Sequence, residues 1–210
     1  DSMVNKYTAN RRLRSEDAYS PDGRHDMRPE YPTIVYTRIL KQLYPDVPVI
    51  LGGIEASLRR LTHYDYWQER FRPCILCDSG ADLIVYGMGE KAVAEISHTL
   101  QAAIENNHES LDYDADGKAR INTGTFREVI TRPGRIPQTV ALYHKAGIPG
   151  GIREEDVVLH PHEECLKDMK AQAANFRHIE EESNKLHADR ILQQTGEDYV
   201  VVNPPYPPMT

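Results

Sequence analysis

Two glycine-containing turns are the segments of this sequence best suited by residue type and spacing to bind a ligand. Gly-Gly-Ile-Glu occupies 52–55 and Gly-Met-Gly-Glu occupies 87–90, each directly after an aliphatic run. Glycine lets the backbone approach a bulky cofactor closely, and backbone amides at a helix start bind anions. The alternative is that the glycines only form tight strand-to-helix turns, with Glu90 stabilised by the helix dipole. Neither a Gly-x-Gly-x-x-Gly fingerprint nor a Walker lysine motif is present.

An aromatic stretch with acid/base groups, His-Tyr-Asp-Tyr-Trp at 63–67, follows the first turn. It either lines a pocket or forms an amphipathic wedge whose polar tips lie in water, and the residues favour neither reading. The sequence contains no nucleophile elbow, no pair of catalytic carboxylates at a defined spacing and no complete triad.

Three groups of potential metal ligands are each better explained without a metal. Cys74 and Cys77 have the spacing of a zinc half-site, but no second pair exists and the residues between them are apolar, which favours burial. His160, His162 and Cys165 lie at the start of a predicted helix. The segment 112–117 matches half of a calcium loop, whose required glutamate is replaced by threonine. We therefore predict no metal site.

A parallel α/β unit is predicted to position the two glycine turns. A helix is expected from Pro32 until Pro45, followed by a buried strand at 47–51 and a short helix at 56–61, with Leu58 and Leu61 facing inward. A second buried strand at 82–86 precedes a helix from Glu90. The apolar face of that helix is expected to comprise Val93, Ile96, Leu100 and Ile104.

The fold class predicted is a parallel Rossmann-like sheet of the cobalamin-binding-domain type, flanked by helices. The Rossmann-like core is expected at 1–105, after an irregular start at 1–31. A polar insertion at 106–160 would carry short strands near 126–131 and 139–143, at the surface or the sheet edge. The segment 161–210 would hold a long helix at 162–192 ended by Gly196, a last strand at 198–202 and an extended proline-rich tail. Along the long helix, helical spacing relates Leu166, Met169, Ala173, Phe176 and Ile179.

Parallel strands build ligand sites beyond their carboxyl ends, so both glycine turns should line one crevice. The residues expected in this crevice are Gly52, Gly53, Glu55, Ser57, Arg59, Arg60, His63, Tyr64, Gly87, Gly89 and Glu90.

Composition and charge narrow the classes of partner. The net charge is −7, with 25 Lys and Arg against 32 Asp and Glu, so we expect no nucleic-acid binding. No apolar segment is long enough to cross a membrane. Three cysteines and no export leader lead us to expect a cytoplasmic protein. Because the chain begins without Met and ends in a proline-rich run, we expect both ends to continue in a longer protein.

Several strings together resemble the conserved region of YgiQ-type radical S-adenosylmethionine (SAM) proteins. The resemblance covers nearly the whole chain and is weakest at 106–161. The strings that carry it are Asp-Ser-Met-Val-Asn-Lys-Tyr-Thr at 1–8, Arg-Arg-Leu-Arg-Ser at 11–15, Leu-Gly-Gly-Ile-Glu-Ala-Ser-Leu-Arg-Arg at 51–60, His-Tyr-Asp-Tyr-Trp at 63–67, Ala-Asp-Leu-Ile-Val-Tyr-Gly-Met-Gly-Glu at 81–90 and Asn-Pro-Pro at 203–205.

The resemblance implies a region that precedes a radical SAM barrel acting on an unknown substrate. In that barrel a Cys-x3-Cys-x2-Cys motif ligates a 4Fe-4S cluster and SAM chelates the fourth iron. The motif is absent here, and Cys74, Cys77 and Cys165 lack its spacing, so none is assigned as a cluster ligand. The glycine turns are also similar to cobalamin-binding domains, but the Asp-x-His-x-x-Gly motif for the axial histidine is missing, which argues against cobalamin.

The resulting hypothesis is a non-catalytic accessory domain that covers or feeds the radical site of the full-length enzyme. Its partners would be its own radical SAM core and an unknown small-molecule substrate. The first alternative is a free-standing module that binds a nucleotide or a corrinoid. A second alternative is a metal-dependent hydrolase built on His160, His162 and Cys165.

Overall fold

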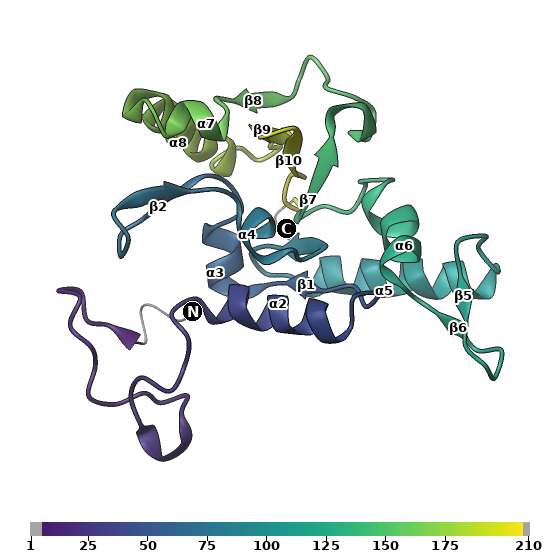
Figure 1. Cartoon of the computed structure of the whole chain (residues 1–210). Coiled ribbons are helices and arrows are strands. Elements are labelled where there is room, and N and C mark those ends of the chain that lie inside the picture. The colour runs from purple at the N-terminus through teal and green to yellow at the C-terminus, as the bar shows by residue number, and fades with distance from the viewer. Residues whose placement is uncertain (1–5, 208–210) are drawn as a thin grey trace.

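The computed structural model describes residues 6–207, and Figure 1 shows the arrangement of its elements. Residues 1–5 and 208–210, including the start of the first family-like string and the end of the tail, lie outside the described part. The helices are η1 (Pro21–Gly23), α2 (Pro32–Leu43), α3 (Gly53–Leu58), α4 (Ile75–Ser79), α5 (Glu90–Glu105), α6 (Thr123–Phe126), η2 (Arg127–Thr131), η3 (Lys145–Gly147), α7 (His162–Cys165) and α8 (Met169–Ser183). The strands are β1 (Ile50–Leu51), β2 (His63–Asp65), β3 (Arg70–Arg72), β4 (Leu83–Val85), β5 (Asp112–Tyr113), β6 (Ala119–Arg120), β7 (Thr139–His144), β8 (Val157–Leu159), β9 (Ile191–Thr195) and β10 (Asp198–Val202).

A six-stranded sheet in the order β1-β4-β7-β10-β9-β8 forms the centre of the molecule. β1 pairs with β4 in parallel, with Ile50 opposite Leu83, and β8 pairs with β9 in parallel. The remaining three pairings, β4 with β7, β7 with β10 and β10 with β9, are antiparallel. The expected α/β class is therefore confirmed, but the sheet is mixed rather than wholly parallel, and a Rossmann or cobalamin-binding fold is not established.

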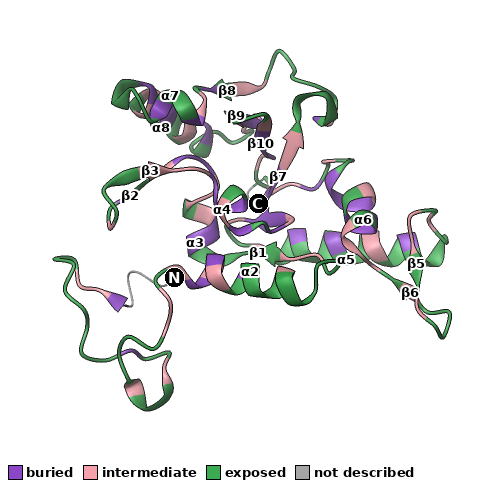
Figure 2. Cartoon of the chain, viewed as in Figure 1, coloured by how far each residue is buried: buried purple, intermediate pink, exposed green. Residues whose placement is uncertain are grey.

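Helices cover both faces of this sheet because successive strand residues point to opposite sides. On one face Ile84 clusters with Ile34 of α2 and Leu76 of α4. On the other face Leu83 and Val85 cluster with residues of α5, α6 and η2. The buried residues in Figure 2 accordingly concentrate where the helices meet the sheet.

The predictions for the first half of the chain agree well with the structure. The helix after Pro32 is α2, the strand at 82–86 contains β4, and the helix from Glu90 is α5. The strand expected at 47–51 is shorter, because only Ile50–Leu51 pairs as β1. Residues 6–31 are mostly irregular, as expected, and contain η1 and two isolated β-bridges. Asp17 anchors this segment through a 2.7 Å ion pair with Arg28.

The predictions for the middle of the chain need correction. Residues 126–131 lie in the helical elements α6 and η2, not in a strand. The strand expected at 139–143 is β7, which lies inside the sheet between β4 and β10 rather than at its edge or on the surface. Val140 and Ala141 are both buried, because helices or loops cover each face of the sheet. A strand buried on both faces lacks the alternation of polar and apolar residues, so its sequence does not show whether it lies inside the sheet or at its edge.

The long helix expected at 162–192 is also wrong. α7 ends at Cys165, and Asp168 caps the start of α8 by accepting a 2.8 Å hydrogen bond from the backbone N–H of Lys170. α8 ends at Ser183, and the next segment returns to the sheet as β9. Gly196 therefore lies in the β9–β10 turn, with φ of +61°, and does not end a helix.

Two predicted apolar faces are only partly buried in the structure. In α5 the buried residues are Ala92, Ile96 and Ala103, whereas Val93 is 51% exposed. Leu61 is buried as expected, but Leu58 is 70% exposed. None of the helices described between residues 6 and 207 combines the length and apolarity that crossing a bilayer requires.

Candidate functional site

Three strands of the sheet end on the same side of the molecule. β4 and β10 are both antiparallel to β7, so they point the same way, and β1 is parallel to β4. Gly52, Gly87 and Asn203, which follow these strands closely, therefore lie at one end of the sheet, here called the carboxyl rim. The prediction that both glycine turns share one end of adjacent parallel strands is confirmed by the pairing of Leu51 with Ile84.

At three of the four rim glycines, a residue with a side chain would be strained or would clash with a neighbour. Gly53 and Gly87 have φ of +79° and +68°, which residues with a side chain rarely adopt. Gly89 has an ordinary φ, but a Cβ there would lie 2.7 Å from Cγ1 of Val85. Gly52 differs, because its φ is −147° and an added Cβ would lie 3.6 Å from the nearest atom, the carbonyl oxygen of Val85.

Asn203 joins the end of β10 to its neighbours and was not predicted as a site residue. Its Nδ2 donates to the carbonyl oxygen of Ile136 at 3.2 Å and to Oγ1 of Thr139 at 2.9 Å. The hydroxyl of Tyr86 donates to the Asn203 carbonyl oxygen at 2.6 Å. The Asn-Pro-Pro string is the sequence signal for this contact, but its position depends on the direction of β10, which the sequence alone did not give.

Glu55 and Arg59 of the expected crevice belong to a partly buried network on α3. An oxygen of Glu55 lies 3.1 Å from the Arg59 guanidinium, and the hydroxyl of Thr33 donates to the other oxygen at 2.8 Å. Burial alone raises the pKa of Glu55, but the Thr33 hydrogen bond and the Arg59 charge lower it below its ordinary value. The Arg59 guanidinium also lies 5.5 Å from the ring centre of Tyr31.

Asp65 anchors the hairpin formed by β2 and β3. It accepts a 2.7 Å hydrogen bond from the hydroxyl of Tyr31 and further bonds from the backbone N–H groups of Trp67 and Gln68. Burial raises the pKa of Asp65, and these hydrogen bonds more than offset it, so the pKa is lowered. Asp65 is only 3% exposed and thus has a structural role in fixing the hairpin.

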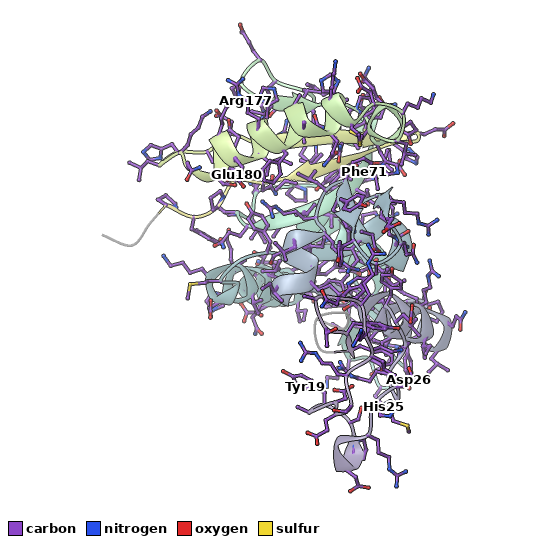
Figure 3. The ribbon with its side chains drawn as sticks, turned by 90° about the vertical axis from the view of Figure 1, so that its left-hand side faces the viewer. Tyr19, His25, Asp26, Phe71, Arg177 and Glu180 are labelled. Atoms are coloured by element: carbon purple, nitrogen blue, oxygen red, sulfur yellow. The ribbon has the colours of Figure 1, made fainter. Side chains whose placement is uncertain are left out.

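An apolar groove of about 630 Å³ lies between the end of α3, the β2–β3 hairpin and α8, and is here called the α8 groove. In Figure 3, Phe71 and Glu180 lie on the inner side of α8, and Arg177 lies on its outer side. The groove is lined mainly by Leu58, Leu61, Tyr64, Phe71, Met169 and Phe176.

The residues expected in one crevice therefore occupy two places. Arg60, His63 and Tyr64 line the α8 groove, whose described lining includes neither glycine turn. Arg60 connects the groove to the carboxyl rim, because it also lines a smaller cavity with Tyr86 and its guanidinium lies 5.0 Å from that ring centre. Burial raises the pKa of Tyr86 to about 12, so its hydroxyl stays protonated as the donor to Asn203.

His63 presents a neutral imidazole to this region. Its Nδ1 lies 3.2 Å from the carbonyl oxygen of Leu61, and burial lowers its pKa to about 4. With the proton on Nδ1, Nε2 is an acceptor, and it has no hydrogen-bond partner among the described residues. Oε1 of Gln172 is likewise buried without a partner in the described chain, while its Nε2 donates to Thr62 at 3.2 Å.

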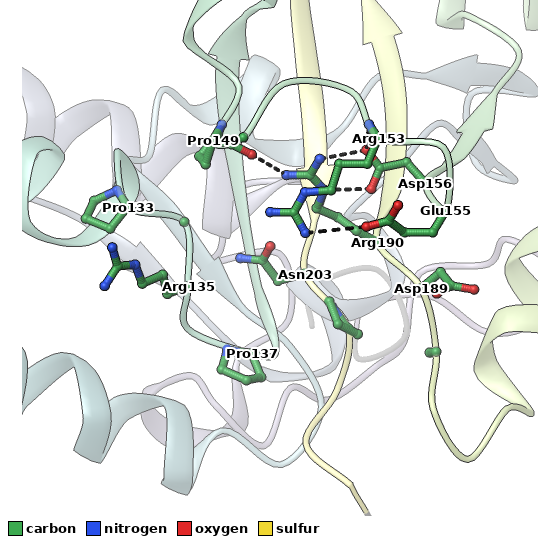
Figure 4. Close-up of a pocket in the computed structure, with 14 residues that line it drawn as sticks. Pro133, Arg135, Pro137, Pro149, Arg153, Glu155, Asp156, Asp189, Arg190 and Asn203 are labelled. Atoms are coloured by element: carbon green, nitrogen blue, oxygen red, sulfur yellow. Dashed lines mark hydrogen bonds and ion pairs between the residues drawn. The ribbon is translucent and has the colours of Figure 1, made fainter.

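A second large cavity, of about 610 Å³, has a polar lining that includes a buried ion pair, and Figure 4 shows this cavity. The side chains of Arg190 and Asp156 are 7% and 0% exposed and form an ion pair of 2.6 Å. Arg190 also donates to the carbonyl oxygens of Pro149 and Gly151. Its donors are thus engaged in holding the loop before β8 against β9.

The side chains proposed as metal ligands do not converge. Among residues 6–207 no group of three or more His, Cys, Asp or Glu side chains is placed to hold a metal ion. Cys74 and Cys165 are buried and Cys77 is exposed, and none forms a disulfide. Nδ1 of His162 lies 3.0 Å from the Thr62 hydroxyl. The described residues therefore do not fit the ligand set of a 4Fe-4S cluster, which needs several thiolates together.

Comparison with known proteins gives a family for the whole chain. A sequence model described as "Radical SAM N-terminal" matches residues 1–210. A UPF0313 protein of Bacteroides thetaiotaomicron is 57% identical over the full chain, which spans 32% of that relative, and one of Porphyromonas gingivalis is 56% identical, with 29% of its length covered. A putative UPF0313 protein of Yersinia pestis is 33% identical. No solved structure matches this chain.

These matches confirm the resemblance stated from the sequence. The chain belongs to the radical SAM N-terminal family, and its relatives are the UPF0313, or YgiQ-type, proteins. It spans about a third of the length of the curated relatives it matches.

Proposed function

We propose that this chain is an accessory domain of a radical SAM enzyme, in which it covers or feeds the radical site without supplying the cluster ligands. The observation that carries this proposal is the match of the whole chain to the radical SAM N-terminal family, while it spans only about a third of its relatives. The 4Fe-4S cluster and SAM would then be bound by the remainder of the full-length protein.

The carboxyl rim is the surface that we assign to the radical site. This assignment is supported by the meeting there of three family-like strings that are far apart in the sequence and contain Gly53, Gly87 and Asn203. Gly52 is the best candidate for close approach of a ligand, since neither its φ nor crowding requires glycine. The substrate would be a small molecule, and the unpaired cysteines are consistent with a cytoplasmic location.

The first experiment compares cluster assembly in this chain and in the full-length protein. Both are incubated anaerobically with iron and sulfide, and the visible absorbance of a 4Fe-4S cluster is measured. We expect a stoichiometric cluster in the full-length protein and none in the 210-residue chain. A stoichiometric cluster on the chain alone would contradict its assignment as the cluster-free part.

The second experiment tests the carboxyl rim with a matched pair of substitutions in the full-length protein. Gly52→Leu should preserve folding and cluster content but slow SAM consumption under reducing conditions, because the added side chain projects from the rim. Gly147→Leu is the control, since its glycine has open space around it, has no positive φ and follows β7 at the opposite end of the sheet. Equal SAM consumption by both variants would remove the rim from the radical site.

A further inference from the structure

The α8 groove is an apolar surface that the described chain leaves open. Met169 is 77% exposed, Leu58 is 70% exposed and Phe176 is 59% exposed. Tyr64 on β2 is also 53% exposed and faces the same groove. Contiguous exposed apolar surface of this kind marks interaction sites more often than isolated apolar residues do.

Polar as well as apolar residues hold α8 against the domain, and Ile179 packs against the hydrophobic core. The buried residues of α8 are Ala171, Asn175 and Glu182. Asn175 accepts a 2.8 Å hydrogen bond from the backbone N–H of His160, and Glu182 accepts one of 2.8 Å from that of Asp189. These polar contacts fix α8 in an orientation in which Met169 and Phe176 line the groove and remain exposed.

The polar atoms beside the groove point to the same conclusion. Nε2 of His63 and Oε1 of Gln172 are buried acceptors with no partner among the described residues. Nε of Arg60 is a buried donor that also has no partner among them. A buried polar atom without a partner is energetically unfavourable, because it has lost its hydrogen bonds to water. An occupant that brings hydrogen-bonding groups as well as apolar side chains would therefore complement this surface.

The groove lies close to the point where the described chain ends. A smaller cavity of about 200 Å³ shares Arg60 and Ser183 with the groove and is also lined by Pro204 and Pro205. In the relatives, about two thirds of the polypeptide lies outside the region that this chain matches. A segment tethered nearby has a high effective concentration at the groove, which favours it over a partner that must diffuse in.

We propose that the α8 groove binds an apolar segment from the portion of the same polypeptide that follows this domain. The proposal rests on the assignment of the chain as an accessory domain, and it names the surface that fixes the domain to the radical SAM portion. The occupant packs apolar side chains against Met169, Phe176 and Leu58 and offers donors to His63 and Gln172.

The test measures amide hydrogen exchange in the 210-residue chain and in the full-length protein. We expect the amides of α8 and of the β2–β3 hairpin to exchange at least about tenfold more slowly in the full-length protein. In the full-length protein, Phe176→Asp should abolish this difference. Phe176→Asp in the 210-residue chain gives the baseline, where the exposed side chain makes little difference to exchange. Leu43→Asp is the matched control, because Leu43 on α2 is 65% exposed and outside the groove.

Two outcomes would overturn the proposal. The first is equal exchange of α8 in the short and full-length proteins. The second is protection of α8 in the 210-residue chain that rises with protein concentration and is accompanied by dimers in sedimentation, which would make a second copy the occupant. Cluster absorbance is recorded on the same full-length samples. A protected groove without a cluster would contradict the proposed function alone, and a cluster with an unprotected groove would contradict this inference alone.

Discussion

The side-chain hydroxyl of Ser57 accepts a 3.0 Å hydrogen bond from the backbone N–H of Gly87 and donates one of 2.8 Å to the carbonyl oxygen of Gly53. A single hydroxyl on α3 therefore connects the two glycine turns of the carboxyl rim. The turns follow β1 and β4, whose parallel pairing already places them side by side. A substitution that displaces one turn should consequently also shift the backbone of the other.

Gly89→Ala is expected to destabilise the domain by about 1–3 kcal/mol, because the new Cβ would lie 2.7 Å from Cγ1 of the buried Val85. Gly52→Ala is the matched comparison, since its Cβ would make an ordinary contact of 3.6 Å, and it should cost less than about 1 kcal/mol. Urea unfolding gives both values. Adding Val85→Ala to Gly89→Ala should recover the part of the stability loss that the close contact causes. Equal stability of Gly89→Ala and Gly52→Ala would instead show that the rim relaxes around the added methyl group.

His63 is expected to make the domain sensitive to mild acid. Burial lowers its pKa from 6.5 to about 4, so the unfolded chain binds the proton more readily than the folded one. The associated stability is fully present above pH 6.5 and is lost as the pH falls towards 4, by roughly 3 kcal/mol at most. Unfolding free energies measured across this range should depend less on pH in His63→Gln. His98→Gln, on the exposed side of α5, should keep the full dependence.

The ion pair between Asp156 and Arg190 is expected to be essential because it is buried. Arg190 lowers the pKa of Asp156 against the opposing effect of burial. Asp156→Asn leaves the guanidinium without its charge partner and should cost about 3–5 kcal/mol. Arg153→Met in the same cavity is the control, since that side chain is 49% exposed, and should cost less than about 1 kcal/mol.

The measurement for this pair is the thermal unfolding midpoint of each variant. The double variant Asp156→Leu with Arg190→Met should be more stable than Asp156→Asn alone, because no buried charge remains unpaired. A midpoint for Asp156→Asn within error of that for Arg153→Met would show that the pair is dispensable.

The three cysteines are expected to differ in reactivity towards a disulfide reagent at pH 8. Burial of Cys74 raises the pKa of its thiol, and the side chain is fully buried, so it should not react until the protein unfolds. Cys77 is exposed, but partial burial of its sulfur and the charges of Asp78 and Asp198 raise its pKa to about 11. It should react on the order of a hundredfold more slowly than a free thiol.

The release of thionitrobenzoate measures these rates. Cys77→Ser should remove the slow phase seen in the folded protein and leave two thiols that react only in denaturant. A fast phase at any cysteine would contradict the local environments described for these side chains.

The sequence was informative where apolar periodicity or a glycine fixed the local structure. α2, β4, α5 and β10 were predicted close to their observed positions, because each has a clear pattern and a proline, glycine or turn beside it. The carboxyl rim was predicted from the glycines that end two aliphatic runs. These features depend on neighbouring residues, which a sequence displays directly.

The features missed depend on contacts between distant segments. The helix expected to reach 192 ends at Ser183, and no proline or glycine between 184 and 190 marks the change to β9. Asn203 joins the rim only because β10 runs in the same direction as β4, which pairing with β7 decides. Helical spacing identified the apolar residues of α8, but it did not predict that contacts of Asn175 and Glu182 would leave Met169 and Phe176 exposed.

The outermost strands of the sheet are short, with two residues in β1 and three in β8. Each margin therefore offers few free backbone groups to which a strand of another polypeptide could add. At these two margins, contact with a neighbour depends on the shape and chemistry of side chains, so single substitutions there can weaken the contact while leaving the backbone ladder intact.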